Sequence, residues 1–439
     1  MFDKFVNRHI GCSNPDTLKA MLDTIGVGSV EELVSQVLPS DIRLNAPLAL
    51  GESMSEYEFA AHIQELAARN QQFRSFIGMG YYPNASSAAI MRNVFENPAW
   101  YTSYTPYQAE ISQGRLEALL NYQTAIISLT GMEIANCSLL DEGTAAAEAM
   151  AMMFALRSRE AVKEGRNLLF VDENIFPQTL DVLLTRSEPF GIELIVDNYA
   201  DYTFTGKEFG AIVQYPAANG EVRDYSDFVA AAHAVGALVT ADADLLALAL
   251  LAPPAEWGAD IAVGTTQRLG CPMGFGGPSA GYMATKEAFK RNMPGRIIGV
   301  SVDRLGRRAL RMSMQMREQH IKRERATSNI CTASALMASI VGFHCVYNGA
   351  EGLRRAALTA HLSALSAAKG IEALGYKVSC ADFFDTLDIE AEASVVESVA
   401  EEHHINFYYP SEFRVRISFD DVTTSAEVEE VVAIFAEAK

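Results

Sequence analysis

Residues 237–268 read ALVTADADLLALALLAPPAEWGADIAVGTTQR, and this stretch decides the fold. It contains two short, almost continuous apolar runs, Ala237–Ala241 and Asp260–Gly264, each followed by polar residues. Similar runs recur on both sides, with helical stretches between several of them, at Asn167–Val171, Ile192–Val196, Gly210–Gln214 and Gly281–Ala284. Because strands buried on both faces read as continuous apolar runs, the pattern predicts a mostly parallel sheet in an α/β fold.

The segments outside this alternation predict two further regions. Residues 1–72 read as a helical N-terminal arm, in which Ser55–Phe73 has the apolar spacing of an amphipathic helix. Residues 73–332 then form the large α/β domain. After a helical stretch at Ala333–Gly349, the chain alternates helix, strand, strand, helix, strand, helix. This order predicts a small C-terminal α+β domain over residues 333–439.

The composition excludes several classes of function. The chain has 439 residues, of which 49% are hydrophobic, and this is enough for a large core. A formal net charge of −20 disfavours binding to nucleic acid or to an anionic membrane surface. The six cysteines are scattered without a CxxC pair and are expected to be reduced thiols in a cytoplasmic protein. The eight histidines show no metal-ligand spacing, so no metal site is expected.

Long motifs cover most of the chain and carry a specific resemblance. They are Arg8–Gly11, Phe76–Tyr82, Asn97–Arg115, Ala135–Ala145, Thr240–Leu246, Met273–Pro278, Arg317–His320 and Ala326–Thr332. In these motifs the chain resembles the glycine decarboxylase P-protein of the glycine cleavage system, in its N-terminal half or separate subunit 1 (the α subunit). The resemblance implies the architecture of fold-type I pyridoxal-phosphate-dependent transferases.

The resemblance also implies partners and a reaction. In the family, two homologous halves pair, either fused or as separate subunits. The pair decarboxylates glycine on pyridoxal phosphate and passes the aminomethyl group to the lipoyl arm of the H-protein. The expected partners are therefore a lysine-bearing C-terminal half or subunit 2, the lipoylated H-protein and glycine.

This half lacks the amine that the cofactor needs. Pyridoxal phosphate forms a Schiff base with a lysine, yet no lysine occurs between Lys207 and Lys286. The resemblance places the Schiff-base position at about Gln267. An amide cannot condense with an aldehyde because its nitrogen lone pair is delocalised, and the neighbouring Arg268 is always protonated. The sequence therefore predicts no catalytic residue and no covalently bound cofactor in this chain, with pyridoxal phosphate in the partner half.

Three further cofactor contacts are altered or ambiguous. Asp242 ends a predicted strand and could pair with a pyridinium nitrogen, but Asp242 and Asp244 could equally be loop or cap residues. Asp141 and Glu142 occupy the helix start where a phosphate would bind, and an acidic N-cap is the better interpretation. Phe176 stands where many relatives carry a histidine, so any stacked ring here would offer no proton.

The chain could still supply walls to the partner's active site. The candidates are hydroxyl-rich or acidic residues in two segments, namely Tyr81, Tyr82, Tyr101, Ser103, Tyr104, Thr105 and Glu110. Alternatively, tyrosines at this spacing cover one helix face, although Pro106 interrupts a regular helix. A second loop could reach the partner's phosphate across the interface or cap the following helix, through Thr327, Ser328 and Asn329.

Two other functions also fit the sequence. The chain could be a purely structural or regulatory interaction subunit. It could also be a self-sufficient pyridoxal-phosphate enzyme that uses another lysine, such as Lys286 or Lys322, although both lie outside the expected strand-to-loop position.

The glycine cluster Gly274–Pro278 predicts a tight turn beside the degenerate pocket, that is, the cofactor pocket that lacks its lysine. A basic region around Arg296 and Arg304–Arg311 either docks an acidic partner or pairs with carboxylates of the chain itself.

Overall fold

The computed structural model describes residues 9, 14–44, 46, 48–102, 106, 108–313, 322–326, 328, 330 and 334–439. The chain divides into two compact units, residues 1–72 and residues 73–439. The first holds helices α2 (Pro15–Ile25), α3 (Val30–Val37) and α4 (Glu56–Ala67), which are capped by Asn14, Ser29 and Ser55. None of these helices contains a fully buried residue, although Leu22 and Leu33 are half-buried. The expected helix from Ser55 begins as predicted but ends at Ala67 instead of Phe73, and the Asn70 side chain donates to the Ala67 carbonyl at that end.

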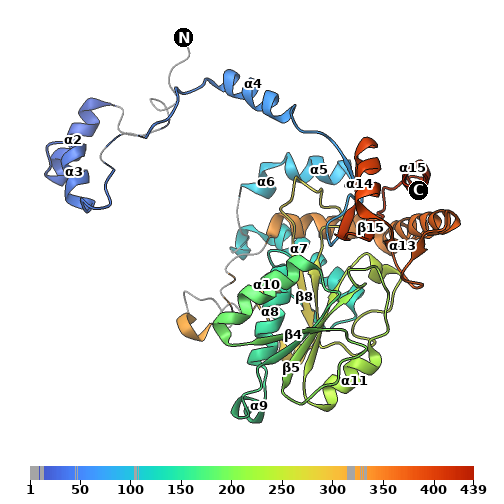
Figure 1. The fold of residues 1–439 in the computed structure, drawn as a ribbon. Helices are drawn as coiled ribbons and strands as arrows, with labels where there is room; N and C mark the ends of the chain where they lie inside the picture. The colour runs from blue at the N-terminus through green and yellow to red at the C-terminus, as the bar shows by residue number, and fades with distance from the viewer. Residues whose placement is uncertain are drawn as a thin grey trace. The chain divides into compact units, whose positions relative to one another are not determined.

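The second unit is built on a sheet in which seven strands are described (Figure 1). Their spatial order is β2-β8-β7-β6-β5-β3-β4. Neighbours from β4 to β7 are parallel, whereas β8 runs antiparallel to both of its neighbours, β7 and β2. The bounds are β2 Ile134–Ala135, β3 Leu168–Asp172, β4 Glu193–Asp197, β5 Glu208–Tyr215, β6 Leu238–Ala243, β7 Ile261–Thr265 and β8 Gly281–Thr285. Each of the six apolar runs in the sequence is therefore a strand, and the mostly parallel α/β sheet is confirmed.

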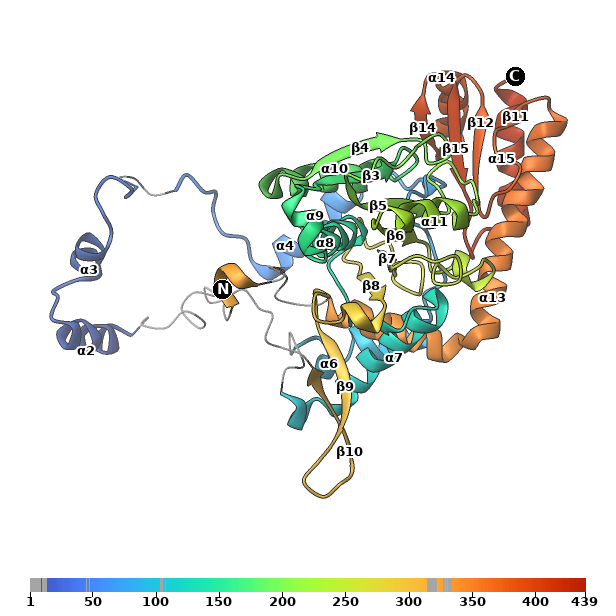
Figure 2. The ribbon, with the colours of Figure 1, turned by 90° about the horizontal axis from the view of Figure 1, so that it is seen from below.

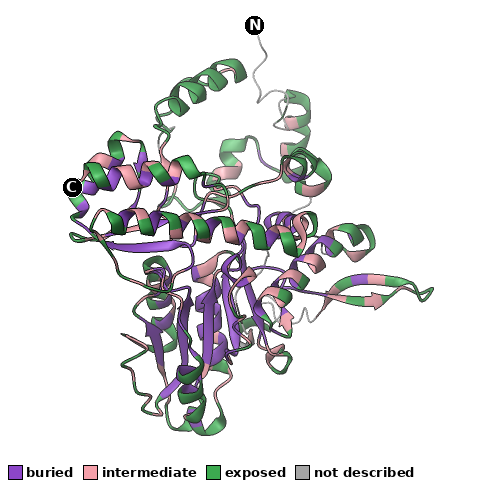
Figure 3. Cartoon of the chain, turned by 90° about the vertical axis from the view of Figure 1, so that its right-hand side faces the viewer, coloured by how far each residue is buried: buried purple, intermediate pink, exposed green. Residues whose placement is uncertain are grey.

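Helices cover both faces of this sheet. On one face α8 (Glu142–Ala155) and α10 (Pro177–Ser187) form a core with strand residues such as Leu169 and Val263. On the other face the core includes residues from α7 (Gln113–Thr130), α11 (Ser226–Ala234) and the first part of α13 (Ala335–Ala373). Shorter helices are α5 Ala88–Phe95, α6 Pro98–Tyr101, α9 Arg159–Lys163, η1 Ala109–Ile111, η2 Glu188–Phe190, η3 Ala247–Ala249, η4 Glu287–Phe289 and η5 Arg323–Arg325. The inner strands of the main sheet are purple, hence buried, between greener helices in Figure 3, whereas the edge strand β4 is exposed or half-buried.

A second antiparallel sheet lies beside the C-terminal half of α13 (Figure 2). Its order is β11-β12-β15-β14, from the strands β11 Lys377–Val378, β12 Thr386–Glu390, β14 Tyr408–Ser411 and β15 Arg414–Ser418. The helices α14 (Ala393–Glu402) and α15 (Ser425–Glu437) complete a separate core around Ile389 and Phe435. A short parallel pair joins β1 (Arg74–Ser75) to β13 (Ile405–Asn406). The predicted domain boundary at 332/333 lies outside the described residues.

Helix α13 links the two cores through one backbone kink. At Gly349 the backbone takes φ 62° and ψ −179°, which is not helical. Glycine suits this position because a side chain is disfavoured at such a φ. Residues before the kink, such as Ile340, pack in the core of the parallel sheet, whereas Ala364 and Ile371 pack in the C-terminal core.

A two-stranded hairpin of β9 (Ile297–Val302) and β10 (Arg308–Ser313) projects from the main sheet (Figure 2). In its loop Arg307 pairs with Asp303, and Arg308 lies 3.5 Å from Glu117, so part of the basic region pairs with the chain's own carboxylates. Across the described ranges, every helix is too short or too polar to cross a membrane.

Candidate functional site

The candidate site lies where parallel strands of the main sheet end. Asp242 is on β6, close to its carboxyl end, and Gln267 follows β7. The start of α8, the loop 78–82 and the C-terminal sheet converge on the same place, because residues from all of them line one cavity. This is the edge at which open α/β sheets bind their ligands.

Gln267 is completely buried and its amide is fully engaged. Its Oε1 accepts a hydrogen bond of 2.9 Å from the Tyr82 backbone N–H. Its Nε2 donates to the carbonyls of Tyr82 at 2.8 Å and Cys271 at 3.0 Å. The Asn84 side chain reinforces this contact by donating to the Gln267 and Cys271 carbonyls. The side chain at the expected Schiff-base position therefore clamps the loop around Tyr82 onto the turn after β7.

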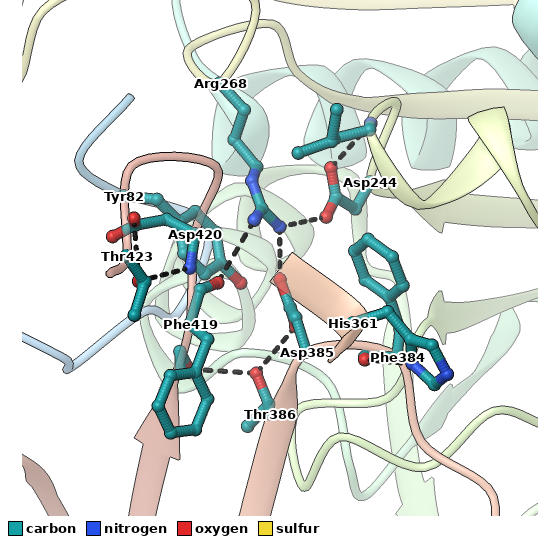
Figure 4. Close-up of polar contacts among 12 residues, drawn as sticks. Tyr82, Asp244, Arg268, His361, Phe384, Asp385, Thr386, Phe419, Asp420 and Thr423 are labelled. Carbon is teal, nitrogen blue, oxygen red and sulfur yellow. Dashed lines mark hydrogen bonds and ion pairs between the residues drawn. The ribbon is translucent and has the colours of Figure 1, made fainter. Parts of the chain in front are cut away.

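Arg268, 4% exposed, ties the large sheet to the C-terminal sheet (Figure 4). Its Nη1 donates to Asp244 at 2.6 Å and to Asp385 at 2.5 Å, while Nη2 donates to the Phe419 carbonyl at 3.3 Å. The Tyr82 ring lies 3.8 Å from the guanidinium carbon. Burial lowers the pKa of Arg268, but the charges of Asp244 and Asp385 outweigh it and raise this pKa above its ordinary value. We refer to Arg268, Asp244, Asp385 and Tyr82 as the Arg268 cluster.

Asp242 and Glu142 form a second buried acidic group. Asp242 has no exposed surface, and among the described residues only the carboxyl group of Glu142 can share a hydrogen bond with it, when one of the two is protonated. Burial, and then repulsion by Glu142, raises the pKa of Asp242 well above its ordinary value. Burial also raises the pKa of Glu142 to about 7, although Gln214 donates to its Oε1 at 3.4 Å. The pair therefore favours the protonated form near neutral pH.

This pair predicts a pH dependence of stability. Because folding raises both pKa values, the pair stabilises the folded state at low pH, and this contribution is lost as the pH rises from 4.5 towards 7. Asp242→Asn keeps a neutral side chain throughout and should reduce that loss by about 2 kcal/mol. Urea unfolding of both proteins at several pH values measures the difference, with Asp201→Asn on an exposed turn as the control. Parallel pH profiles for Asp242→Asn and wild type would rule out the raised pKa.

The inner cavity between these groups is small. It has a volume of about 20 Å³ and is lined by residues such as Gly80, Glu142, Phe176 and Arg268. That is room for roughly one water molecule. Gly80 takes φ +83°, and a side chain there would collide with Glu142. Phe176, 8% exposed, is the N-cap residue of α10 and forms a wall, so the replacement of the expected histidine fills space here.

The expected acidic cap at the helix start is present. Asp141 is the N-cap residue of α8, and its Oδ1 accepts a 2.8 Å hydrogen bond from the Thr144 N–H. The helix begins at Glu142, three residues before the predicted Ala145. Asp244 is both a cap and an ion-pair partner, since its Oδ1 accepts from the Leu246 N–H while Oδ2 faces Arg268. The carboxyl groups of Asp141 and Glu142, at the start of α8, therefore occupy the place where a phosphate would meet the helix dipole.

The predicted wall residues are only partly described. Tyr81 donates its hydroxyl to the Met273 carbonyl at 2.7 Å, and Tyr82 packs in the Arg268 cluster. Tyr101 is 49% exposed at the end of α6, and Glu110 is exposed in η1. The hydroxyl of Ser328 accepts from the Ile330 N–H. The remaining candidates lie outside the described residues, namely Ser103, Tyr104, Thr105, Thr327 and Asn329.

The two alternative lysines occupy other places. Lys286 pairs with Asp260 at 2.5 Å, at the opposite edge of the sheet, where β7 begins. Lys322 is exposed immediately before η5. Asp385, by contrast, was not singled out from the sequence, although it completes the Arg268 cluster. It lies 117 positions from Arg268, so no local spacing connects the two residues.

Comparisons with known proteins find one family and several relatives that the chain resembles over almost its whole length. A family model described as "Glycine cleavage system P-protein" matches residues 7–435. The chain is 55% identical over 436 residues to the glycine dehydrogenase (decarboxylating) of Flavobacterium johnsoniae, and 52% identical over 438 residues to that of Bacteroides fragilis. Each match covers 99% of this chain and 46% of the relative. The chain thus spans about half the length of the curated relatives it matches.

Solved structures agree with the fold. A crystal structure of glycine decarboxylase (P-protein) in inhibitor-bound form superposes with a TM-score of 0.87 at 32% identity, covering 97% of this chain and 99% of that chain. The glutamate decarboxylase of Lactobacillus brevis has a TM-score of 0.65 at 12% identity, covering 91% and 96% of the two chains, and is similar in fold alone. The architecture is that of fold-type I pyridoxal-phosphate enzymes.

The residues present do not fit pyridoxal phosphate. The family and its structural neighbours depend on this cofactor. Here the inner cavity has only about 20 Å³, and an engaged amide stands at the lysine position. The carboxylate of Asp141, the N-cap residue of α8, faces the place of the phosphate and would repel the dianion. To make room for the cofactor, side chains around the inner cavity would have to separate. Those of the Arg268 cluster are instead held together by ion pairs.

Proposed function

Because this chain belongs to the glycine cleavage system P-protein family, we propose that it is the non-catalytic half of a glycine dehydrogenase (decarboxylating). A lysine-bearing C-terminal half holds pyridoxal phosphate and carries out the covalent chemistry. This chain corresponds to the N-terminal half and completes the partner's active site. Glycine and the lipoylated H-protein are the other partners, and a cytoplasmic location belongs to the same proposal.

The observation that carries the proposal is the buried amide of Gln267. It supports an inactive half because the amide is not nucleophilic and its hydrogen bonds hold the surrounding loops together. The length of the relatives supports a missing half, since this chain covers 46% of them. The cofactor supplies an electron sink for decarboxylation when it is bound in the partner. The residues of this chain then act by shaping the site and excluding water.

The surface offers a contact for such a partner. Phe275 is fully exposed and sits at φ +56°, a strained conformation for a residue other than glycine. The glycine cluster was interpreted from the sequence as a tight turn, and the structure adds that this turn presents an aromatic side chain to solvent. Exposed aromatic residues are common anchors of protein interfaces. We assign Phe275 to the contact with the lysine-bearing half.

Reconstitution tests the function. This chain alone should show no glycine–bicarbonate exchange, and mixing it with the lysine-bearing half of a P-protein should produce exchange that neither half shows alone. Phe275→Ala should weaken pairing by about tenfold or more, because an interface anchor contributes on the order of 2 kcal/mol. Phe413→Ala, at another exposed phenylalanine, is the matched control. Exchange by the chain alone would contradict the proposal.

One substitution separates an active-site wall from a purely structural role. Glu110→Gln removes a carboxylate from the exposed segment before α7. If Glu110 touches glycine in the assembled enzyme, the KM for glycine should rise by about tenfold, as expected for the loss of a charged hydrogen bond. Unchanged kinetics in a fully assembled complex would favour the structural role for this segment.

A further inference from the structure

A further pocket lies at the amino-terminal edge of the main sheet, opposite the candidate site. It is bounded by the starts of β5 and β6, the end of α8, the short helix α9 and η4, and Figure 1 shows α9 at this edge. Its volume is about 240 Å³, slightly below the usual range of small-molecule sites, so a small ligand fits it. We call it the edge pocket. We propose that the edge pocket binds a small monocarboxylate with a flat apolar body, and this inference does not depend on the proposed function.

Arg157 supplies the charge that such a ligand would meet. It lines the edge pocket, and its Nε and Nη1 donate to the backbone carbonyls of Phe154 and Arg166, both at 2.7 Å. The Phe154 ring, whose centroid lies 3.3 Å from the guanidinium carbon, covers one face of the group. Among the described residues Arg157 has no carboxylate partner and its Nη2 makes no hydrogen bond, so two N–H groups are available. Burial lowers the pKa of Arg157, and no neighbouring carboxylate raises it. A fixed, half-buried cation without a counter-ion favours an anionic ligand.

The other charged residues of the edge pocket already have partners. Arg166 pairs with Glu164 at 2.9 Å. Glu208 has no exposed surface, and its carboxylate accepts hydrogen bonds from Tyr202 and from the turn before β5, none of whose residues lines the pocket. The carbonyl ends of α8 and α11 also meet this edge, but Arg157 and Arg166 each donate to a carbonyl of one of them. Arg157 is therefore the charge of this pocket that a ligand can reach without displacing a partner.

The rest of the edge pocket fits a flat apolar body. Its wall includes the half-buried Leu156, Leu238 and Phe289 and the buried Phe209. Phenyl rings in a wall favour a flat ligand that can stack on them or meet their edges. The Ser158 hydroxyl accepts from a backbone N–H of α9 at 3.1 Å and keeps its own hydrogen as a donor. The pocket thus combines donors for one carboxylate with apolar surface beside them, which matches an organic monoanion better than an inorganic one.

Calorimetry on the purified chain tests the site without any partner. The probe is benzoate at neutral pH, with benzamide and benzylamine as comparison solutes at equal ionic strength. Benzoate should bind with a Kd of about 1 mM and raise the melting temperature. Benzamide has the same shape without the charge and should bind about tenfold more weakly or less, and benzylamine should not bind. The absence of benzoate binding would overturn this inference but would leave the reconstitution test unaffected, so the two proposals can be judged separately.

Variants locate the binding. Arg157→Gln should raise the Kd for benzoate by about tenfold or more, since it removes the charged donor. Phe289→Ala removes part of the aromatic wall and should raise the Kd severalfold, which provides a second test if Arg157→Gln fails to fold. Arg159→Gln removes an exposed charge of α9 that does not line the pocket and should leave the Kd within about twofold. Benzamide binding as tightly as benzoate, or benzoate binding unchanged in Arg157→Gln or in Phe289→Ala, would overturn the proposal.

Discussion

Arg268→Met should lower the free energy of unfolding by about 3–5 kcal/mol. The substitution keeps much of the side-chain volume but leaves the carboxylates of Asp244 and Asp385 without their cation. Asp385 is 4% exposed, so its charge cannot be rehydrated without moving the C-terminal sheet. The same change removes the donor to Phe419 and the cation that packs on Tyr82. Urea unfolding measures the loss, and hydrogen exchange should increase in β12 and β15.

Two controls separate charge burial from general perturbation. Arg307→Met removes an ion pair with Asp303, but that arginine side chain is 73% exposed, so about 0.5 kcal/mol or less should be lost. A triple variant, Arg268→Met with Asp244→Asn and Asp385→Asn, leaves no unpaired charge and should recover part of the stability. A loss below about 1 kcal/mol in Arg268→Met would show that the Arg268 cluster does not hold the two sheets together.

Gln267→Leu should lower the free energy of unfolding by about 3 kcal/mol. Leucine has a similar size, but it leaves the N–H and carbonyl of Tyr82 and the carbonyl of Cys271 without this partner. Each buried backbone group that loses a hydrogen bond costs about 1 kcal/mol or more. Chemical denaturation provides the value. Gln178→Leu, which removes one exposed hydrogen bond to Met79, is the matched control and should change stability by about 0.5 kcal/mol or less.

Restoring lysine at the same position should not restore the cofactor site. In Gln267→Lys the new ammonium could donate to the two carbonyls, but it cannot accept from the Tyr82 N–H and it lies next to Arg268. The inner cavity would still have only about 20 Å³. We therefore expect no borohydride-reducible adduct with pyridoxal phosphate by mass spectrometry. A specific adduct at residue 267 would mean that the degenerate pocket opens easily.

Much of the fold follows from local sequence patterns. The six apolar runs are strands of the main sheet, and all but the edge strand β4 are mostly buried, as continuous apolar runs predict. The acidic N-cap of α8 could be predicted because Asp141 acts on a backbone N–H only three residues away. The helix predicted from Ser55 was too long at its end, since helix termini depend on weak local bonds such as the one from Asn70.

The candidate site could be predicted only in part. A glutamine where an amine is needed is visible in the sequence, and it is enough to predict that no Schiff base forms. That the same amide clamps the Tyr82 loop could not be predicted, because Tyr82 is 185 positions away. The contact of Arg268 with Asp385 could not be predicted either, because the two residues are 117 positions apart.

The sequence by itself determined the parallel sheet, the acidic helix start and the missing amine, because each depends on residue type or on neighbours along the chain. Only the tertiary structure decided what surrounds residue 267 and the end of β6: an amide clamp, an arginine between two carboxylates and a buried acid pair whose pKa values are raised. These depend on burial and on contacts between distant segments, which raise the cost of any unpaired charge. Such energies exist only once the strands, loops and C-terminal sheet have come together.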